Sequence, residues 1–112
     1  MAAGNYDIVI DQGANFALEF QISEEGQAVN LSSHSVTAQL RPTPSSNTLT
    51  ATFTCAITSA SEGKFTMKLG HAVTANIAAG KYYYDTEIHN SEIDSITRLV
   101  QGVARVTQNV TR

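Results

Sequence analysis

The sequence is poor in the residue types that most often reveal a chemical function. It has no tryptophan, two prolines and one cysteine, and charged residues make up 15% of its 112 positions, well below the usual quarter. The single cysteine, Cys55, excludes an internal disulfide. Cys55 lies in an alternating run and points the same way as Phe53 and Ile57, so we predict a small core residue rather than a reactive thiol.

Charge and hydropathy exclude two classes of partner. Seven Lys and Arg residues stand against ten Asp and Glu residues, and the formal net charge is −3. The basic residues are scattered and form no stripe that would bind phosphates, so we expect no direct contact with nucleic acid. No stretch approaches the ~18 consecutive apolar residues of a membrane span, so we expect no membrane partner.

The chain is rich in short runs that alternate apolar and polar residues, as β-strands do. The runs recur with turn signals about every 8 to 12 residues, which is typical of a β-sandwich. They cover residues 6–10, 16–22, 29–31, 36–41, 49–57, 64–69, 82–89 and 96–106. Residues 71–79 are the one expected helix, a short crossover with Gly80 as its C-terminal cap.

These patterns predict one all-β domain over residues 1–112. We expect an immunoglobulin-like antiparallel β-sandwich of about seven to eight strands, with short mobile arms at residues 1–5 and 107–112. Gly102, inside the last strand, is expected at a bulge or a close backbone approach. The side chains predicted to face the core are Phe16, Leu18, Phe20, Ile22, Leu49, Ala51, Phe53, Cys55, Ile57, Phe65, Met67, Leu69, Ala104 and Val106.

Three adjacent tyrosines follow Gly80 and open a late strand. In a strand, Tyr82 and Tyr84 share one face and Tyr83 takes the other. One of the three is expected to act as a tyrosine corner, in which the phenol bonds to the backbone upstream. A tyrosine that faces outward would instead suit a protein interface, because aromatic side chains offer a large contact area for little lost entropy. Both roles stay open for different members of the run.

Two further segments are candidate protein contacts. The first predicted strand, with Tyr6, Ile8 and Ile10, is our choice for an unpaired sheet edge that a partner could extend. The loop from residue 42 to 47 contains Pro42 and Pro44, which cannot donate to a strand ladder, and it is therefore expected to be exposed.

The sequence indicates no catalytic or metal centre. His34, His71 and His89 stand in different predicted segments without paired ligands at a fixed spacing, so we expect no metal and no cofactor. Asp85 and Glu87 lie on one face of a strand, about 7 Å apart, which we interpret as a solvated face. No serine lies in a Gly-x-Ser-x-Gly elbow and no glycine-rich phosphate loop precedes a helix, so we do not expect an enzyme.

Several segments together resemble a known group of proteins. The opening residues 6–16, with Gln12-Gly13-Ala14 between two strands, are similar to the start of small tailed-phage virion proteins. Residues 63–69, 79–85, 97–102 and 110–112 follow in the same order, so the resemblance covers nearly the whole chain. Such proteins look like the immunoglobulin-like N-terminal domains of phage baseplate upper proteins. The resemblance implies assembly and attachment, with no catalytic residues to carry over.

We therefore expect a non-enzymatic structural protein of a tailed-phage virion, in the tail or baseplate. It would be made in the cytoplasm of the bacterial host and packed in many symmetric copies against other virion structural proteins. One alternative is a capsid decoration or head-to-tail neck protein. Another is a carbohydrate-binding module for host recognition, in which surface tyrosines stack on sugar rings and Asp85, Glu87 or Asn90 bond hydroxyls. The absence of tryptophan counts against that alternative.

Overall fold

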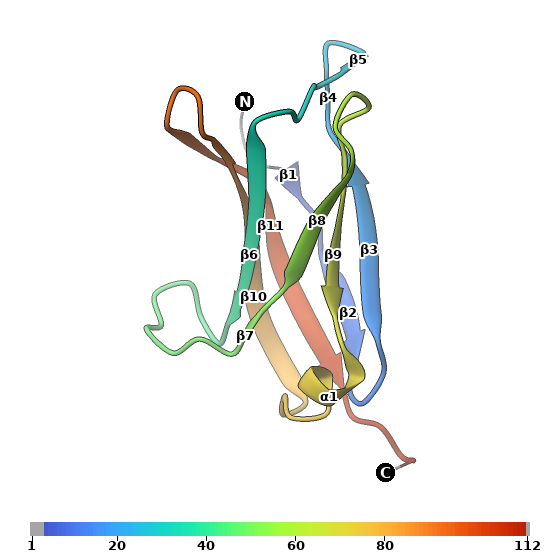
Figure 1. Ribbon diagram of the computed structural model, residues 1–112. Coiled ribbons are helices and arrows are strands. Elements are labelled where there is room, and N and C mark those ends of the chain that lie inside the picture. The colour runs from blue at the N-terminus through green and yellow to red at the C-terminus, as the bar shows by residue number, and fades with distance from the viewer. Residues whose placement is uncertain (1–3, 112) are drawn as a thin grey trace.

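The computed structural model describes residues 4–111, which fold into two packed β-sheets (Figure 1). The larger sheet consists of β1 (Gly4–Asn5), β2 (Ile8–Asp11), β6 (His34–Arg41), β7 (Ala51–Thr52), β10 (Gly80–Asn90) and β11 (Ser95–Thr107). The smaller sheet consists of β3 (Phe16–Gln21), β8 (Thr54–Ser59) and β9 (Lys64–Leu69). A separate hairpin joins β4 (Ser23–Glu24) to β5 (Gln27–Ala28), and α1 spans His71–Thr74.

The strand order confirms the predicted immunoglobulin-like β-sandwich. The larger sheet runs β1-β11-β10-β6-β7, with β2 also paired to β11, and the smaller sheet runs β3-β9-β8. The smaller sheet thus matches strands B, E and D of an immunoglobulin domain, and β6, β10 and β11 match strands C, F and G. All pairs are antiparallel except β1 and β2, which run parallel to β11.

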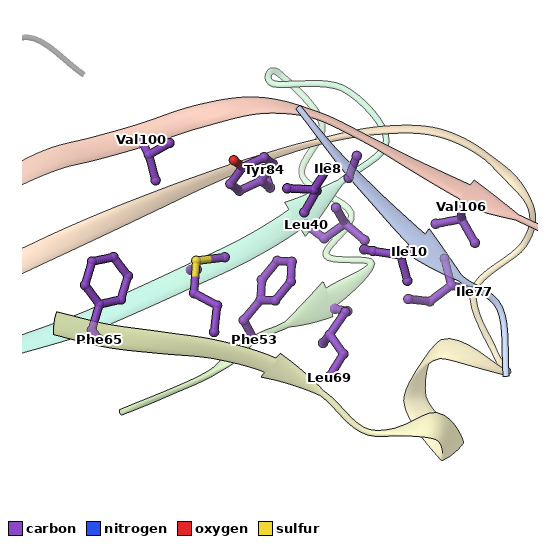
Figure 2. Close-up of a cluster of buried hydrophobic side chains, with 14 of the residues drawn as sticks. Ile8, Ile10, Leu40, Phe53, Phe65, Leu69, Ile77, Tyr84, Val100 and Val106 are labelled. Carbon is purple, nitrogen blue, oxygen red and sulfur yellow. The ribbon is translucent and has the colours of Figure 1, made fainter. Parts of the chain in front are cut away.

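The core lies between the two sheets, where the inward rows of both meet. Figure 2 shows Tyr84 and Val100 of the larger sheet on the side facing Phe65 and Leu69 of β9. The predicted inward rows of β3 and β9 are confirmed: the β9 row is buried, whereas Phe16, Leu18 and Phe20 of β3 are only partly buried against the core. The buried set is Ile8, Ile10, Leu31, Ala38, Leu40, Ala51, Phe53, Phe65, Met67, Leu69, Ile77, Tyr84, Ile88, Val100, Ala104 and Val106.

The run at residues 49–57 is not the single strand that its alternation predicts. It forms two strands in different sheets, because β7 pairs with β6 and β8 pairs with β9. Phe53 lies at the crossing, buried, with its ring near Phe16 and Tyr84 at centroid distances of 6.0 and 6.2 Å. Leu49 is exposed before β7, so its predicted core position is wrong.

The crossover helix is shorter than the sequence predicts. It covers only His71–Thr74. The chain then continues in tighter turns whose hydrogen bonds join residues three apart: the Asn76 N–H donates to the Val73 carbonyl oxygen and the Ile77 N–H to the Thr74 carbonyl oxygen, both at 3.1 Å. Thr74 and Ile77 are both buried, so this segment packs onto the core. Gly80 is therefore not a helix cap; it is the first residue of β10, at a φ of +153°.

Two other expectations about local structure are corrected. The predicted strand at residues 29–31 is absent. The strand of that hairpin is instead β5, which directly precedes these residues and follows Glu25 and Gly26, whose φ values are 52° and 80°. The N-terminal arm expected at residues 1–5 includes β1, which pairs with Val100 and Gln101 of β11, and Thr107 ends β11. Residues 108–111 have no regular structure, and residues 1–3 and 112 lie outside the described part of the chain.

Candidate functional site

The tyrosine run alternates faces as predicted. Tyr82 and Tyr84 turn inward, whereas Tyr83 lies on the outer face of the larger sheet. The Tyr82 hydroxyl donates to the Ala78 carbonyl oxygen at 2.6 Å, four residues upstream, which confirms a tyrosine corner at the crossover. Tyr84 is only 4% exposed, so the prediction that its side chain contacts a partner is wrong.

Tyr84 instead ties the middle of β10 to the N-terminal edge. Its hydroxyl donates to the carbonyl oxygen of Tyr6, in the short link between β1 and β2. Burial, with smaller contributions from the charges of Asp7 and Tyr6, raises the pKa of the Tyr84 phenol to about 12. The phenol therefore stays a neutral donor over the physiological range.

Gly102 lets this link lie close to β11. A Cβ at Gly102 would stand 2.3 Å from the Tyr6 carbonyl oxygen, so only glycine fits here without a shift. Beside it, the Asp7 Oδ1 atom accepts a hydrogen bond from the Val103 N–H at 3.0 Å. Of the two predictions for Gly102, a bulge or a close backbone approach, the structure shows the close approach. The register shift in the β10–β11 ladder lies elsewhere, between Thr86 and Glu87, which pair with Val100 and Arg98.

The N-terminal strand lies at a sheet edge, as predicted, but with different side chains exposed. β2 pairs only with β11 in the described part of the chain. Ile8 and Ile10 are 5% and 0% exposed and belong to the core, so their side chains do not face a partner; contact through the backbone of this edge strand stays a prediction. The exposed large apolar side chains at this edge are Val9 and Tyr6. Val9, 59% exposed, lies on the strand face opposite Ile8 and Ile10. Tyr6, 50% exposed, lies in the link before β2, with its ring 5.8 Å from that of Phe20.

The outer face of the larger sheet carries a shallow polar groove of about 530 Å³. Tyr83, Asp85 and Glu87 of β10 line it, and Pro44 of the exposed 42–47 loop closes one side, whereas Pro42 is not part of the lining. Arg98 crosses from β11 to Asp85, with 3.3 Å between Nε and Oδ2. Asn90, the third residue expected to bond sugar hydroxyls, lies at the end of β10 outside this groove.

The Tyr83 ring is flanked by basic side chains. The Lys81 ammonium lies 5.4 Å from the ring centroid, a cation–π distance, and Arg41 is the register partner of Tyr83 on β6. The groove thus combines one aromatic ring with both carboxylates and guanidinium groups, which suits a polar, uncharged or zwitterionic ligand better than a strongly charged one.

A second exposed surface, which we did not predict from the sequence, is the tip of the β10–β11 hairpin. In Figure 1 this hairpin extends beyond the rest of the sandwich. Its tip carries Ile93, 71% exposed, and Ile96, 64% exposed. The polar residues around Ile93 led us to interpret residues 90–95 as a plain turn, but an isoleucine in a polar turn was a usable signal, because β-branched residues are disfavoured there.

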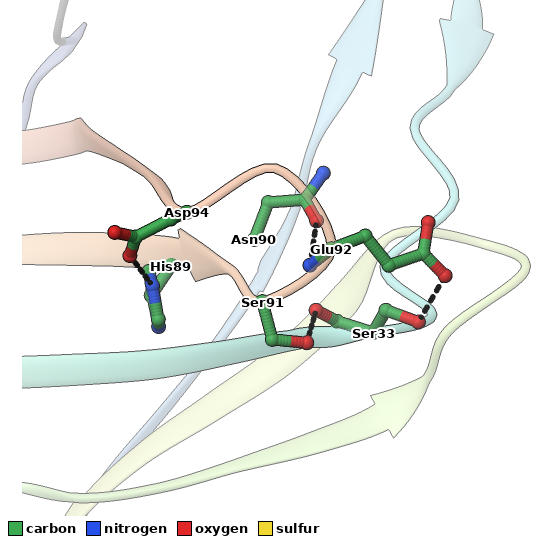
Figure 3. Close-up of polar contacts among 6 residues, drawn as sticks. All are labelled: Ser33, His89, Asn90, Ser91, Glu92 and Asp94. Atoms are coloured by element: carbon green, nitrogen blue, oxygen red, sulfur yellow. Dashed lines mark hydrogen bonds and ion pairs between the residues drawn. The ribbon is translucent and has the colours of Figure 1, made fainter.

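Polar contacts brace the hairpin tip (Figure 3). The Ser91 N–H and hydroxyl both donate to the Ser33 carbonyl oxygen, at 2.9 and 3.0 Å, and the Ser33 hydroxyl donates to Glu92 Oε1 at 2.9 Å. Across the hairpin, His89 Nε2 and Asp94 Oδ1 are 2.9 Å apart. These contacts join the tip to the segment before β6, so the two isoleucines are presented from a braced hairpin.

Within residues 4–111 no three His, Cys, Asp or Glu side chains gather in a way that would hold a metal ion. Cys55 is partly buried against the core, as expected, and burial raises the pKa of its thiol. No helix in this part of the chain is long and apolar enough to cross a membrane.

Comparison with known proteins gives a fold likeness but no family. No family model and no curated protein matches this sequence. Solved structures do match, among them one from a study of glycolipid glycan hydrolysis by a family 123 glycoside hydrolase from Clostridium perfringens. That match has a TM-score of 0.45 and 14% identity, and it covers 97% of this chain and 24% of the other, so this chain spans about a quarter of that protein's length. A likeness this distant carries no argument about function.

Proposed function

We propose that this chain is a non-enzymatic structural and assembly protein of a tailed-phage virion, located in the tail or baseplate. Its partners are other virion structural proteins, which it contacts as one of many copies. The resemblance of residues 6–16 and of the later segments to small virion proteins motivates the proposal. A capsid decoration or head-to-tail neck protein would use the same fold and contacts at a different place on the particle.

The observation that carries the proposal is the braced hairpin tip. Ile93 and Ile96 expose their apolar side chains although each could be replaced by a polar residue without affecting the core. Exposed apolar side chains on a fixed support are typical of protein contacts, because little entropy is lost when they bind. Tyr6 and Val9 at the N-terminal edge are further exposed apolar side chains that a partner could contact.

Cryo-electron microscopy of the intact particle tests this proposal. Density for this chain in the tail or baseplate, with the hairpin tip against a neighbouring subunit, is the expected result. Many copies on the head shell or at the neck would assign it to the alternative positions. Absence of the chain from purified particles, measured by mass spectrometry, would refute a virion role altogether.

A matched pair of variants tests whether the hairpin tip acts in assembly without affecting the stability of the fold. Ile93→Ser with Ile96→Thr is expected to lower incorporation into particles at unchanged thermal stability, because both side chains are exposed in the free protein. Val110→Ser is the control, because it removes another exposed apolar side chain, 92% exposed, away from the hairpin. Equal incorporation of both variants would contradict a docking role for the tip.

The groove around Tyr83 supports a second candidate function, a carbohydrate-binding module for host recognition. A phenol ring beside Asp85, Glu87 and Arg98 offers stacking and hydrogen bonding, the two contacts that sugars need. Titration of host surface glycans followed by NMR is expected to shift the amide signals of the groove. Tyr83→Ala would abolish these shifts, whereas unchanged spectra with every glycan would exclude this candidate.

A further inference from the structure

The sandwich has four sheet edges, and an edge strand exposes unpaired backbone groups that another strand can join. In the larger sheet the edges are β7 on one side and β1 with β2 on the other, and in the smaller sheet they are β8 and β3 (Figure 1). Natural proteins protect such edges by keeping them short, by bulges, or by charged residues.

Three of the four edges are protected in this way. β7 has only two residues, and the 42–50 loop precedes it. The N-terminal edge is interrupted between β1 and β2 and carries the carboxylates of Asp7 and Asp11. β8 has a register shift between Ile57 and Ser59. None of these three offers a long, regular ladder to an incoming strand.

The β3 edge is the least protected: it is neither short nor bulged, and Glu19 is its one charged residue. Its six residues, FALEFQ, pair with β9 without a register shift, and they include no proline, glycine or lysine. In the described part of the chain β3 has no strand on its other side. The inward row of Phe16, Leu18 and Phe20 is only partly buried, so the core is left incompletely covered along this edge.

We propose that β3 pairs with β3 of a second copy of this chain, antiparallel, about a two-fold axis at Leu18. Such an interface is isologous, because the same strand serves both subunits. This register places Phe16 opposite Phe20 of the other copy and Leu18 opposite Leu18 of the other copy. The two partly buried rows then cover each other, and the two smaller sheets become one continuous sheet. The inference stands on this edge and does not depend on a virion location.

The charges on the outward row of β3 favour this register. Glu19 is its one charged residue, and a two-fold axis at Glu19 would set two carboxylates directly opposite, which is unfavourable. With the axis at Leu18, Glu19 of one copy faces the small Ala17 of the other. Lys68 pairs with Ala17 across β9 and β3 of the same copy and is exposed on the same face. It therefore lies two strand spacings, about 9 to 10 Å, from the Glu19 of the other copy that faces this Ala17. A lysine and a glutamate side chain span that separation over an alanine, and symmetry gives two such pairs.

Sedimentation velocity of the purified chain, from low micromolar to sub-millimolar concentration, tests the dimer. We expect a concentration-dependent monomer and dimer, with dissociation about tenfold stronger for Glu19→Lys, because two attractive pairs become repulsive. Adding Lys68→Glu to Glu19→Lys should restore the affinity. Glu24→Lys, the same charge change on exposed β4, is the matched control and should leave it unchanged. Circular dichroism checks that every variant keeps the fold.

Disulfide cross-linking tests the register. In a Cys55→Ser background, a mixture of Ala17→Cys chains and Glu19→Cys chains should form covalent heterodimers under mild oxidation, because these positions face each other. Either chain alone should cross-link much less. A chain that stays monomeric throughout, a dimer indifferent to Glu19→Lys, or equal cross-linking in single and mixed samples would each overturn the proposal.

Discussion

Tyr84→Phe isolates one hydrogen bond in the centre of the fold. The substitution removes the hydroxyl that donates to the Tyr6 carbonyl oxygen and leaves the ring in place between the sheets. The carbonyl then loses a donor in a partly buried position, which costs about 1–2 kcal/mol in the free energy of unfolding near neutral pH. The loss should appear as a lower midpoint of urea unfolding with an unchanged m-value.

The same hydroxyl predicts an alkaline signature. Burial raises the pKa of Tyr84 to about 12, whereas a tyrosine in the unfolded chain titrates near its ordinary value of 10.0. Between these values the unfolded chain has lost the proton and the folded chain keeps it, so stability is complete below pH 10 and falls as the pH rises toward 12. A difference of two units would correspond to about 2–3 kcal/mol for a fully buried group, and solvent screening of the partly buried phenol reduces the loss to about 1–2 kcal/mol.

Urea unfolding at several pH values from 8 to 12, for the wild type and Tyr84→Phe, checks both effects. The wild type should be the more stable at pH 8, and the gap should close by pH 12, because only the wild type loses the Tyr84 contribution. Tyr83→Phe is the control, because the Tyr83 hydroxyl makes no hydrogen bond within residues 4–111. Its free energy of unfolding should follow that of the wild type at every pH. A gap that stays constant through pH 12, or no gap at pH 8, would refute the reasoning.

The remaining predictions concern packing and use urea unfolding. Gly102→Ala should lose about 2–3 kcal/mol, because its Cβ would meet backbone atoms of Tyr6, whereas Gly70→Ala, with open space around it, should lose far less. Tyr82→Phe should lose about 1 kcal/mol through the bond to the Ala78 carbonyl, and an unchanged midpoint would deny the tyrosine corner a stabilising role. Phe53→Ala should lose about 3–5 kcal/mol, since its ring fills the crossing between the sheets; a loss under 1 kcal/mol would mean that the crossing tolerates a cavity.

The predicted faces of several strands held up because the side-chain period of a strand is local. Phe65, Met67 and Leu69 could be assigned to the core from their spacing alone, and Tyr83 could be separated from its two neighbours in the same way. Turn glycines and the prolines of the 42–47 loop marked strand ends for an equally local reason. The element order then indicated a sandwich, since few architectures accommodate so many short strands.

The candidate surfaces were harder to predict than the strands. Tyr83 was correctly placed outside, but Ile8, Ile10 and Tyr84 were proposed as contacts and are buried. The period identifies two faces without saying which of them another layer covers, and in β2 that depends on pairing with β11, almost the whole chain away. The exposed tip at Ile93 was missed because its support comes from Ser33, distant in sequence.

The sequence by itself thus determined most of the strands, their alternating faces and the sandwich that they build. Tertiary structure alone decided that the run through Phe53 divides between two sheets, because its alternation continues unbroken across the crossing. It also decided which edges are left open, with β3 long and regular and the other three protected. Local side-chain periodicity is a property of neighbours in the chain, whereas burial and edge exposure are properties of strands that meet only after the chain has folded.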